Sequence, residues 1–283
     1  MPATVFGGRL TRLVTDQAAL RKRLGLRWWL ELAVLGSFYG VYTVTRNQFG
    51  SAAVEWPVAF DNAELVIDAE EALGLYFEAD LQDLFIDQIA FIQFWNLFYG
   101  TFHFAVTAFA LIFLFFRFPR DYPRWRTIGL ATTGLALIGF SLFPLMPPRL
   151  LGDCGQYGAC LAGTGFVDTV ADIGGLWSFD SGTGQKLSNQ YAAMPSLHFA
   201  WALWCVMVIY PRVTHPLTKL SIVLYPPLTL YAIIVTANHY WLDAVGAVGV
   251  LALGYWLGGA IDDRLAARRS NSVAAPRSES VRQ

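Results

Sequence analysis

Residues 96–117 read NLFYGTFHFAVTAFALIFLFFR, an apolar stretch that carries no acidic side chain and one arginine, at its end. A helix rises about 1.5 Å per residue, so this stretch is long enough to cross the roughly 30 Å hydrocarbon core of a bilayer. The whole chain is 55% hydrophobic and only 14% charged, which is unlike an ordinary soluble domain. The sequence therefore predicts a polytopic membrane protein.

Five further apolar runs have about the length of a spanning helix. We expect an all-α fold, a six-helix transmembrane bundle that forms a single membrane catalytic domain over residues 26–261. A basic segment, 1–25, precedes this domain, and a polar tail, 262–283, follows it and is expected to be disordered. The six runs lie at about residues 26–45, 96–117, 127–147, 195–213, 217–237 and 240–261.

Lys and Arg gather before the first run, between the second and third, between the fourth and fifth, and after the sixth. Basic connections stay in the cytoplasm, so we expect both termini on the cytoplasmic side of the membrane, with the plasma membrane as the location. The opposite face then receives residues 47–95, which hold ten acidic and no basic residues, and residues 148–194. The first run is as long as a full span and no small-residue cleavage site follows it, so a secretory signal peptide is not expected.

The acidic connection 47–95 mixes apolar and acidic positions at helical spacing, which predicts one or two amphipathic helices on the outer surface. Asp80, Asp83 and Asp87 form a carboxylate stripe in this segment. The solvated face of a helix is favoured over a divalent-metal site here, because no further ligand accompanies the stripe. We predict no metal and no cofactor.

Three other residues have interpretations that do not involve catalysis. Cys154 and Cys160 lie in the outer connection, where an oxidising compartment would permit a disulfide, and the spacing leaves open whether they pair. Glu31, in the first run, stands four residues after Arg27, and an ion pair within the helix or a snorkelling side chain would satisfy it.

The strongest chemical signal is a set of ionisable residues at the ends of predicted helices. Polar groups within a bilayer are costly in free energy, so such residues are functional candidates. His239 and Asp243 are four residues apart and share one helix face. The carboxylate can accept a hydrogen bond from one ring nitrogen and leave the other free as a nucleophile. A structural His–Asp pair is the alternative.

The segment MPSLH, residues 194–198, begins another apolar run. Pro195 suits a first helical turn, Ser196 offers a hydroxyl, and unpaired N–H groups at a helix start favour an anion. His198, in the same turn, could donate a proton to a leaving oxygen, so attack and protonation would be divided between two histidines. This arrangement predicts phosphate chemistry at the non-cytoplasmic membrane face.

Three further residues are weaker phosphate-binding candidates. Arg149 lies at the outer end of the third run, where it could bind phosphate or snorkel to the interface. Arg46, at the outer end of the first run, is a second candidate cation. His103 could line the same cavity, although a histidine bonded to a neighbour within the membrane is the favoured interpretation.

With these motifs in place, the chain resembles the type-2 phosphatidic acid phosphatase superfamily, and more closely its inositol phosphorylceramide synthase-like branch, over roughly residues 96–261. The resemblance rests on PSLH and on the spacing from His239 to Asp243. It implies that His239 is the nucleophile, that Asp243 orients it, that His198 is the acid, and that the fold is a helical membrane bundle.

The chain also departs from the superfamily pattern. Ala232 and Ile233 occupy the expected Ser-Arg positions, Leu142 occupies the expected lysine position, and Leu197 replaces a glycine. The synthase-like branch tolerates such losses, so the resemblance favours transfer of a phospho-group from a membrane lipid to a lipid or polyol alcohol. A lipid-phosphate phosphatase that uses water, acting on polyprenyl or phosphatidyl substrates, is the first alternative.

A transporter or non-catalytic scaffold is the second alternative, supported by Pro226 and Pro227 within the fifth run. The chain shows no inverted repeat, and its polar residues collect at one membrane face instead of the midplane. Both observations favour an enzyme. No nucleic-acid partner is expected.

Overall fold

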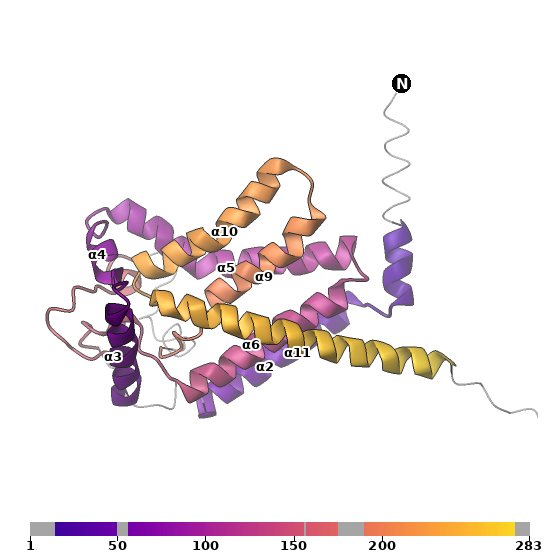
Figure 1. Cartoon of the computed structure of the whole chain (residues 1–283). Helices are drawn as coiled ribbons and strands as arrows, with labels where there is room; N and C mark the ends of the chain where they lie inside the picture. Colours follow the sequence, from indigo (N-terminus) through magenta and orange to yellow (C-terminus); the bar gives the residue numbers. More distant parts are fainter. Residues whose placement is uncertain (1–14, 50–55, 156, 175–189, 275–283) are drawn as a thin grey trace, which may run out of the picture.

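The computed structural model describes residues 15–49, 56–155, 157–174 and 190–274, without the side chains of 45–49 and 269–274. These parts are helical and contain no β-strand, in agreement with the predicted all-α class. Residues 15–23 form a short helix. The helices that follow are α2 (Trp28–Phe49), α3 (Trp56–Ala72), α4 (Glu78–Asp83), α5 (Ile89–Arg117), α6 (Tyr122–Leu142), α7 (Thr169–Asp172), α9 (Leu197–Ile209), α10 (Pro216–Val235) and α11 (Trp241–Ala274), and two short 3-10 turns, η2 (Pro148–Leu150) and η3 (Tyr210–Arg212), lie beside α6 and α9 (Figure 1).

Three of the described helices are long and apolar enough to cross a membrane. They are α5, α10 and the part of α11 from Trp241 to Arg268. The described residues therefore contain three candidate spans, whereas the sequence predicted six. Helix α9, with 13 residues, is shorter than its apolar run of 195–213. Pro195 precedes the helix and Pro211 lies in η3, and proline cannot donate the backbone hydrogen bond that an extended helix would need.

Helices α5, α9 and α10 pack around one apolar core. Trp95 and Phe98 of α5 lie in the same buried cluster as Trp204 and Val208 of α9 and Tyr225 of α10. Burying each such side chain contributes about 1.5–3 kcal/mol relative to leaving it in water. This core holds α9, and with it residues 196–198, in a fixed position relative to α10.

Helix α11 packs along α6, and glycines permit the close approach (Figure 1). A Cβ on Gly254 would lie 2.1 Å from Thr132 Oγ1, and a Cβ on Gly258 would lie 2.6 Å from the Cα of Ile128. Neither position therefore accepts a side chain without movement of α6. The contact fixes α11 against the bundle over several turns.

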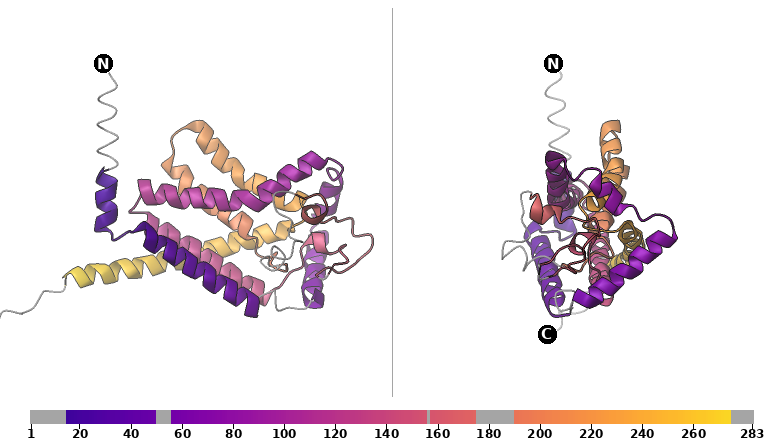
Figure 2. Two further views of the ribbon diagram at one scale, coloured as in Figure 1. Left: turned by 180° about the vertical axis from the view of Figure 1, so that it is seen from behind. Right: turned by 90° about the vertical axis from the view of Figure 1, so that its left-hand side faces the viewer.

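The acidic connection folds into α3 and α4, which confirms the predicted one or two helices. Both lie at one end of the bundle, and the C-terminal end of α11 lies at the other (Figure 2). Ala59, Ala63 and Val66 form the buried face of α3 and pack with Tyr240 in a second apolar cluster. This second cluster sits beside the connection from α10 to α11.

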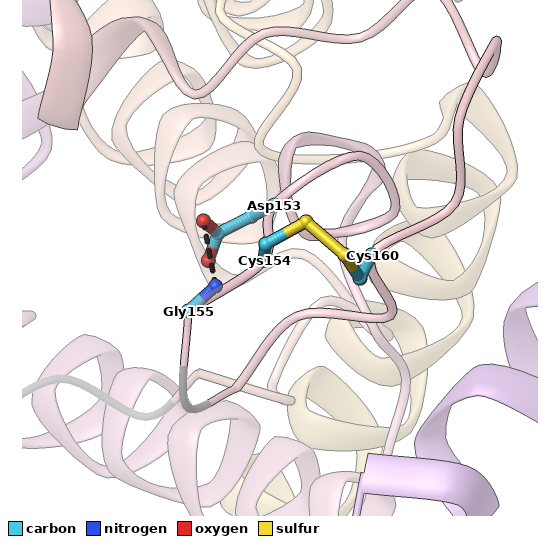
Figure 3. The surroundings of a disulfide bond; sticks show 4 residues. All are labelled: Asp153, Cys154, Gly155 and Cys160. Carbon is cyan, nitrogen blue, oxygen red and sulfur yellow. Dashed lines mark hydrogen bonds between the residues drawn. A yellow bond between two sulfur atoms is a disulfide. The ribbon is translucent and has the colours of Figure 1, made fainter.

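Several contacts fix the position of the long connection after α6. Leu145 and Ala192 form an isolated parallel β-bridge. Cys154 and Cys160 form a disulfide, and Asp153 Oδ1 accepts a hydrogen bond of 3.0 Å from the Gly155 N–H beside it (Figure 3). The disulfide closes the short turn that follows η2.

Two predictions near the chain ends are wrong. Helix α11 continues to Ala274, so residues 262–274 are helical instead of disordered, because this stretch is rich in helix formers and contains neither glycine nor proline. Residues 275–283 lie outside the described part. Glu31 pairs with Arg126 of α6, not with Arg27, and it accepts a hydrogen bond of 3.1 Å from the Tyr122 hydroxyl. Packing of α2 on α6 brings Glu31 to these two partners, whereas Arg27 lies before the first residue of α2.

Candidate active site

His239 lies in the connection between α10 and α11, two residues before the first residue of α11. Its backbone N–H donates to the carbonyl of Ile233, and its ring is 3% exposed. His239 Nδ1 lies 3.0 Å from Asp243 Oδ2, and the same oxygen accepts a hydrogen bond of 3.0 Å from the Tyr240 N–H. A carboxylate can only accept, so Nδ1 carries the proton and Nε2 keeps its lone pair.

Ser196 faces that free nitrogen. Its hydroxyl oxygen lies 3.4 Å from His239 Nε2, and it also accepts a long hydrogen bond from the Phe199 N–H as the N-cap of α9. The Ser196 N–H donates to the backbone carbonyl of Asp243 at 3.0 Å. The start of α9 and the first turn of α11 are therefore bonded directly to each other.

His198, the second residue of α9, completes the group. Its ring centroid lies 5.5 Å from that of His239, with the two ring planes at 67°. One phosphoryl group can contact both rings at this separation, because attack begins from about 3–3.5 Å and a proton is donated over about 2.6–3.2 Å. The structure thus brings His239, Asp243, Ser196 and His198 to one place.

The backbone of Arg149 is hydrogen-bonded to a residue near this group. Its N–H donates to the carbonyl of Ala237 at 2.8 Å, two residues before His239. The side chain is buried, so the snorkelling alternative is wrong; it forms an ion pair with Asp168 and donates to Gln190 at 2.6 Å. The guanidinium is thereby held by two residues of the connection between α6 and α9.

Asp168 is itself fixed by the backbone that follows it. Its carboxylate caps α7 by accepting hydrogen bonds of 3.1 Å from the Val170 and Ala171 N–H groups. The cap leaves the other carboxylate oxygen for Arg149. Sequence reasoning did not identify Asp168 or Gln190, because both lie in a connection with no periodic pattern.

His103 and Tyr99 of α5 pack on the other side of His198. Their ring centroids lie 4.2 and 4.4 Å from that of His198. His103 Nδ1 lies 2.8 Å from the carbonyl oxygen of Tyr99. This contact agrees with the favoured interpretation, in which His103 is bonded to a neighbour. Tyr99 was missed, although its position one helical turn before His103 was a usable signal.

Two parts of the predicted site lie outside the described residues. Arg46 belongs to α2, but its side chain is outside the described part, so its role is untested. Part of the outer connection, residues 175–189, is also outside it. Within the described residues no group of three His, Cys, Asp or Glu side chains could hold a metal ion, and this includes Asp80, Asp83 and Asp87.

A family model described as PAP2 superfamily matches residues 64–257, a range that begins within α3 and extends into α11. The matched range contains His239 and the three residues gathered around it, Asp243, Ser196 and His198. No match was found among curated proteins or among solved structures.

Proposed function

The chain belongs to the PAP2 superfamily, and from this membership we propose that it is a membrane enzyme that transfers a phospho-group from a lipid to an alcohol through His239. Membership itself indicates a lipid phosphatase or phosphotransferase kind of function. The histidine intermediate, the roles of the residues and the acceptor are our proposal. The synthase-like branch and the six-span topology are part of it.

The observation that carries the proposal is the environment of His239 Nε2. Asp243 holds the proton of the ring on Nδ1, and the Ser196 hydroxyl oxygen lies 3.4 Å from Nε2. The ring centroid of His198 lies 5.5 Å from that of His239. A nucleophile, a proton donor and the anion-favouring first turn of α9 thus surround one position. That is the set of groups which phosphoryl transfer without a metal requires.

In the first step, His239 Nε2 attacks phosphorus, so the P–N bond forms and the bond from phosphorus to the lipid oxygen breaks. His198 gives its proton to the departing oxygen, which leaves as an alcohol. The phosphorylated imidazole keeps its Nδ1 proton and becomes cationic. Asp243, fully buried beside it, stabilises that charge.

In the second step, an acceptor hydroxyl attacks phosphorus and the P–N bond breaks. His198, now neutral, takes the proton of the acceptor, and His239 regains its lone pair. Ser196 is 0% exposed and His239 is 3% exposed, and this burial supports an alcohol delivered by the membrane over bulk water. Hydrolysis by water is the alternative outcome of the same intermediate.

The substrate class and location follow from the position of the site. We propose a membrane lipid with a phosphate headgroup as donor, a lipid or polyol alcohol as acceptor, and a site on the non-cytoplasmic face of the plasma membrane with both termini in the cytoplasm. The basic connections support this orientation. We propose that Arg149, whose backbone is bonded to Ala237, contacts the headgroup after it leaves Asp168.

The test is a trapping experiment on the purified protein in detergent, given phosphatidic acid labelled with ³²P in its phosphate. Rapid quenching in alkali should leave label on the wild-type protein, because phosphohistidine survives alkali, and acid should release it. His239→Ala should carry no label and show no turnover, while Ser221→Ala, exposed on α10, serves as the matched control. Turnover by folded His239→Ala would refute the proposal. Transport by the wild-type protein with no phosphate chemistry would favour the transporter alternative instead.

A second measurement separates transfer from hydrolysis. Glycerol or diacylglycerol is added to the reaction, and both inorganic phosphate and phosphorylated acceptor are measured. We expect phosphorylated acceptor to form at the expense of phosphate release. Rapid release of phosphate with no acceptor product would establish the phosphatase alternative.

A further inference from the structure

Two carboxyl groups outside the catalytic set are completely buried next to it. Glu70 and Glu78 are both 0% exposed. Glu70 follows Ala59, Ala63 and Val66 on the buried face of α3, and Glu78 is the first residue of α4. Buried carboxyl groups are costly unless they are bonded, so their contacts call for a functional reason.

Both carboxyl groups bind the N-terminus of α11. Glu78 Oε1 accepts a hydrogen bond of 3.0 Å from the Trp241 N–H, and Glu70 Oε1 accepts one of 3.0 Å from the Leu242 N–H. The first N–H groups of a helix have no partner within the helix, so these are the groups that need an outside acceptor. Glu70 and Glu78 supply it from 172 and 163 residues earlier in the chain.

The catalytic aspartate completes the same set. Asp243 Oδ2 accepts from the Tyr240 N–H and from His239 Nδ1. Three successive N–H groups, those of residues 240, 241 and 242, are thus each bound by a different carboxyl group. His239 immediately precedes them, so the location of its ring depends on how this turn is held.

The surroundings of this turn favour the protonated form of Glu70. Neither forms an ion pair with a described residue, and the positive end of one helix dipole favours a limited negative charge. Burial raises the pKa of Glu70 to about 9, and the nearby charges of Glu78 and Asp243 raise it further in the same direction, while the bond from the Leu242 N–H opposes them. The other titratable groups that face the pair are Tyr76 and Tyr240.

We propose that Glu70 and Glu78 are positioning residues that hold the first turn of α11 and thereby aim His239 at the phosphoryl group. The proposal rests on the function proposed above. In it, Glu70 keeps its proton at neutral pH. Loss of the Glu70 proton places an additional negative charge against Asp243 and loosens the turn.

The experiment measures kcat and KM for Glu70→Ala, Glu78→Ala, Glu70→Gln and, as the matched control on an exposed position of α3, Glu71→Gln. A nucleophile misplaced by about 1 Å loses about 100-fold in rate. We expect kcat of the two alanine variants to fall about 10–100-fold with KM changed less than about threefold. Glu70→Gln keeps the oxygen that accepts from Leu242 and should recover most of the activity that Glu70→Ala loses.

A pH profile separates positioning from a merely structural role. The Glu70 pKa is raised from 4.5 to about 9, so the stability that its proton lends is fully present below pH 4.5 and is lost as the pH rises through about 9. Wild-type kcat should therefore decline above about pH 9, and Glu70→Gln should lack this decline. If the alanine variants do not fold, this comparison still decides the proposal.

The outcomes distinguish the positioning role of Glu70 and Glu78 from the proposed transfer through His239. Folded alanine variants with wild-type kcat, or an unchanged alkaline decline in Glu70→Gln, would refute the positioning role even when His239→Ala is inactive. Lower thermal stability with unchanged kcat per folded molecule would also refute it. Turnover by His239→Ala would refute the proposed function instead.

Discussion

Replacement of Asp243 by asparagine tests the orientation of the nucleophile most directly. The carboxylate accepts two hydrogen bonds of 3.0 Å, from His239 Nδ1 and from the Tyr240 N–H, and its second oxygen is buried without a partner among the described residues. The amide of Asn can enter this space in two ways. Each orientation gives a different loss, and together they bound the effect.

If the amide oxygen takes the place of Oδ2, both hydrogen bonds persist but the bond to the cationic phosphorylated ring is no longer charge-assisted. A charge-assisted bond contributes about 1.5–3 kcal/mol and a neutral bond about 0.5–1.5 kcal/mol, so the difference of about 1–1.5 kcal/mol lowers kcat about 5–10-fold. If the amide nitrogen faces Nδ1 instead, His239 changes tautomer and Nε2 loses its lone pair. The same substitution in a serine-protease triad costs about 10⁴-fold.

We therefore expect kcat of Asp243→Asn to fall between about 5-fold and about 10⁴-fold, with KM changed only slightly. The assay is initial-rate release of product from phosphatidic acid in mixed micelles, with a thermal melt to verify folding. Asp263→Asn is the matched control, because Asp263 lies on the same helix in an exposed pair with Arg124, where ion pairs contribute little. A kcat within threefold of wild type in folded Asp243→Asn would refute the reasoning.

Two further predictions concern stability. Gly254→Ala places a Cβ 2.1 Å from Thr132 Oγ1 and should lower the free energy of unfolding by about 1–3 kcal/mol. Gly249→Ala, with nothing within 4 Å of its Cβ, is the control and should be neutral or slightly stabilising. Equal melting temperatures of the two variants would contradict the close packing of α6 and α11. Asp168→Ala leaves Arg149 as an uncompensated buried charge and should destabilise the protein by about 3–5 kcal/mol, measured by thermal or chemical unfolding; a loss below about 1 kcal/mol would show that Arg149 finds another partner.

The contact that was predicted correctly from the sequence is a local one. A spacing of four residues predicted that Asp243 would bond to His239, although His239 lies before the first residue of α11 instead of within the helix. The helix that was expected to include Pro195 in its first turn begins at Leu197, with Ser196 as its N-cap. The meeting of Ser196 with His239 was expected only from the two motifs lying on one membrane face. Its distance, 3.4 Å, came from packing.

The misjudged residues are those whose partners lie far away in the chain. Glu31 bonds across 95 residues to Arg126, and helix neighbours at a spacing of four could not predict that. The side chain of Arg149 pairs with Asp168, a partner that the sequence did not predict. The predicted span at 195–213 became a 13-residue helix because prolines lie at 195 and 211.

The amino-acid sequence by itself determined that this protein is helical and suited to a membrane, because apolar content and helical periodicity act over one or two turns and need no distant partner. It also determined the pairing of His239 with Asp243. Only the tertiary structure decided that Glu70 and Glu78 hold the first turn of α11 and that Tyr99 and His103 pack on His198. These contacts join segments up to 172 residues apart, and such contacts form only where the burial of apolar surface brings the helices together.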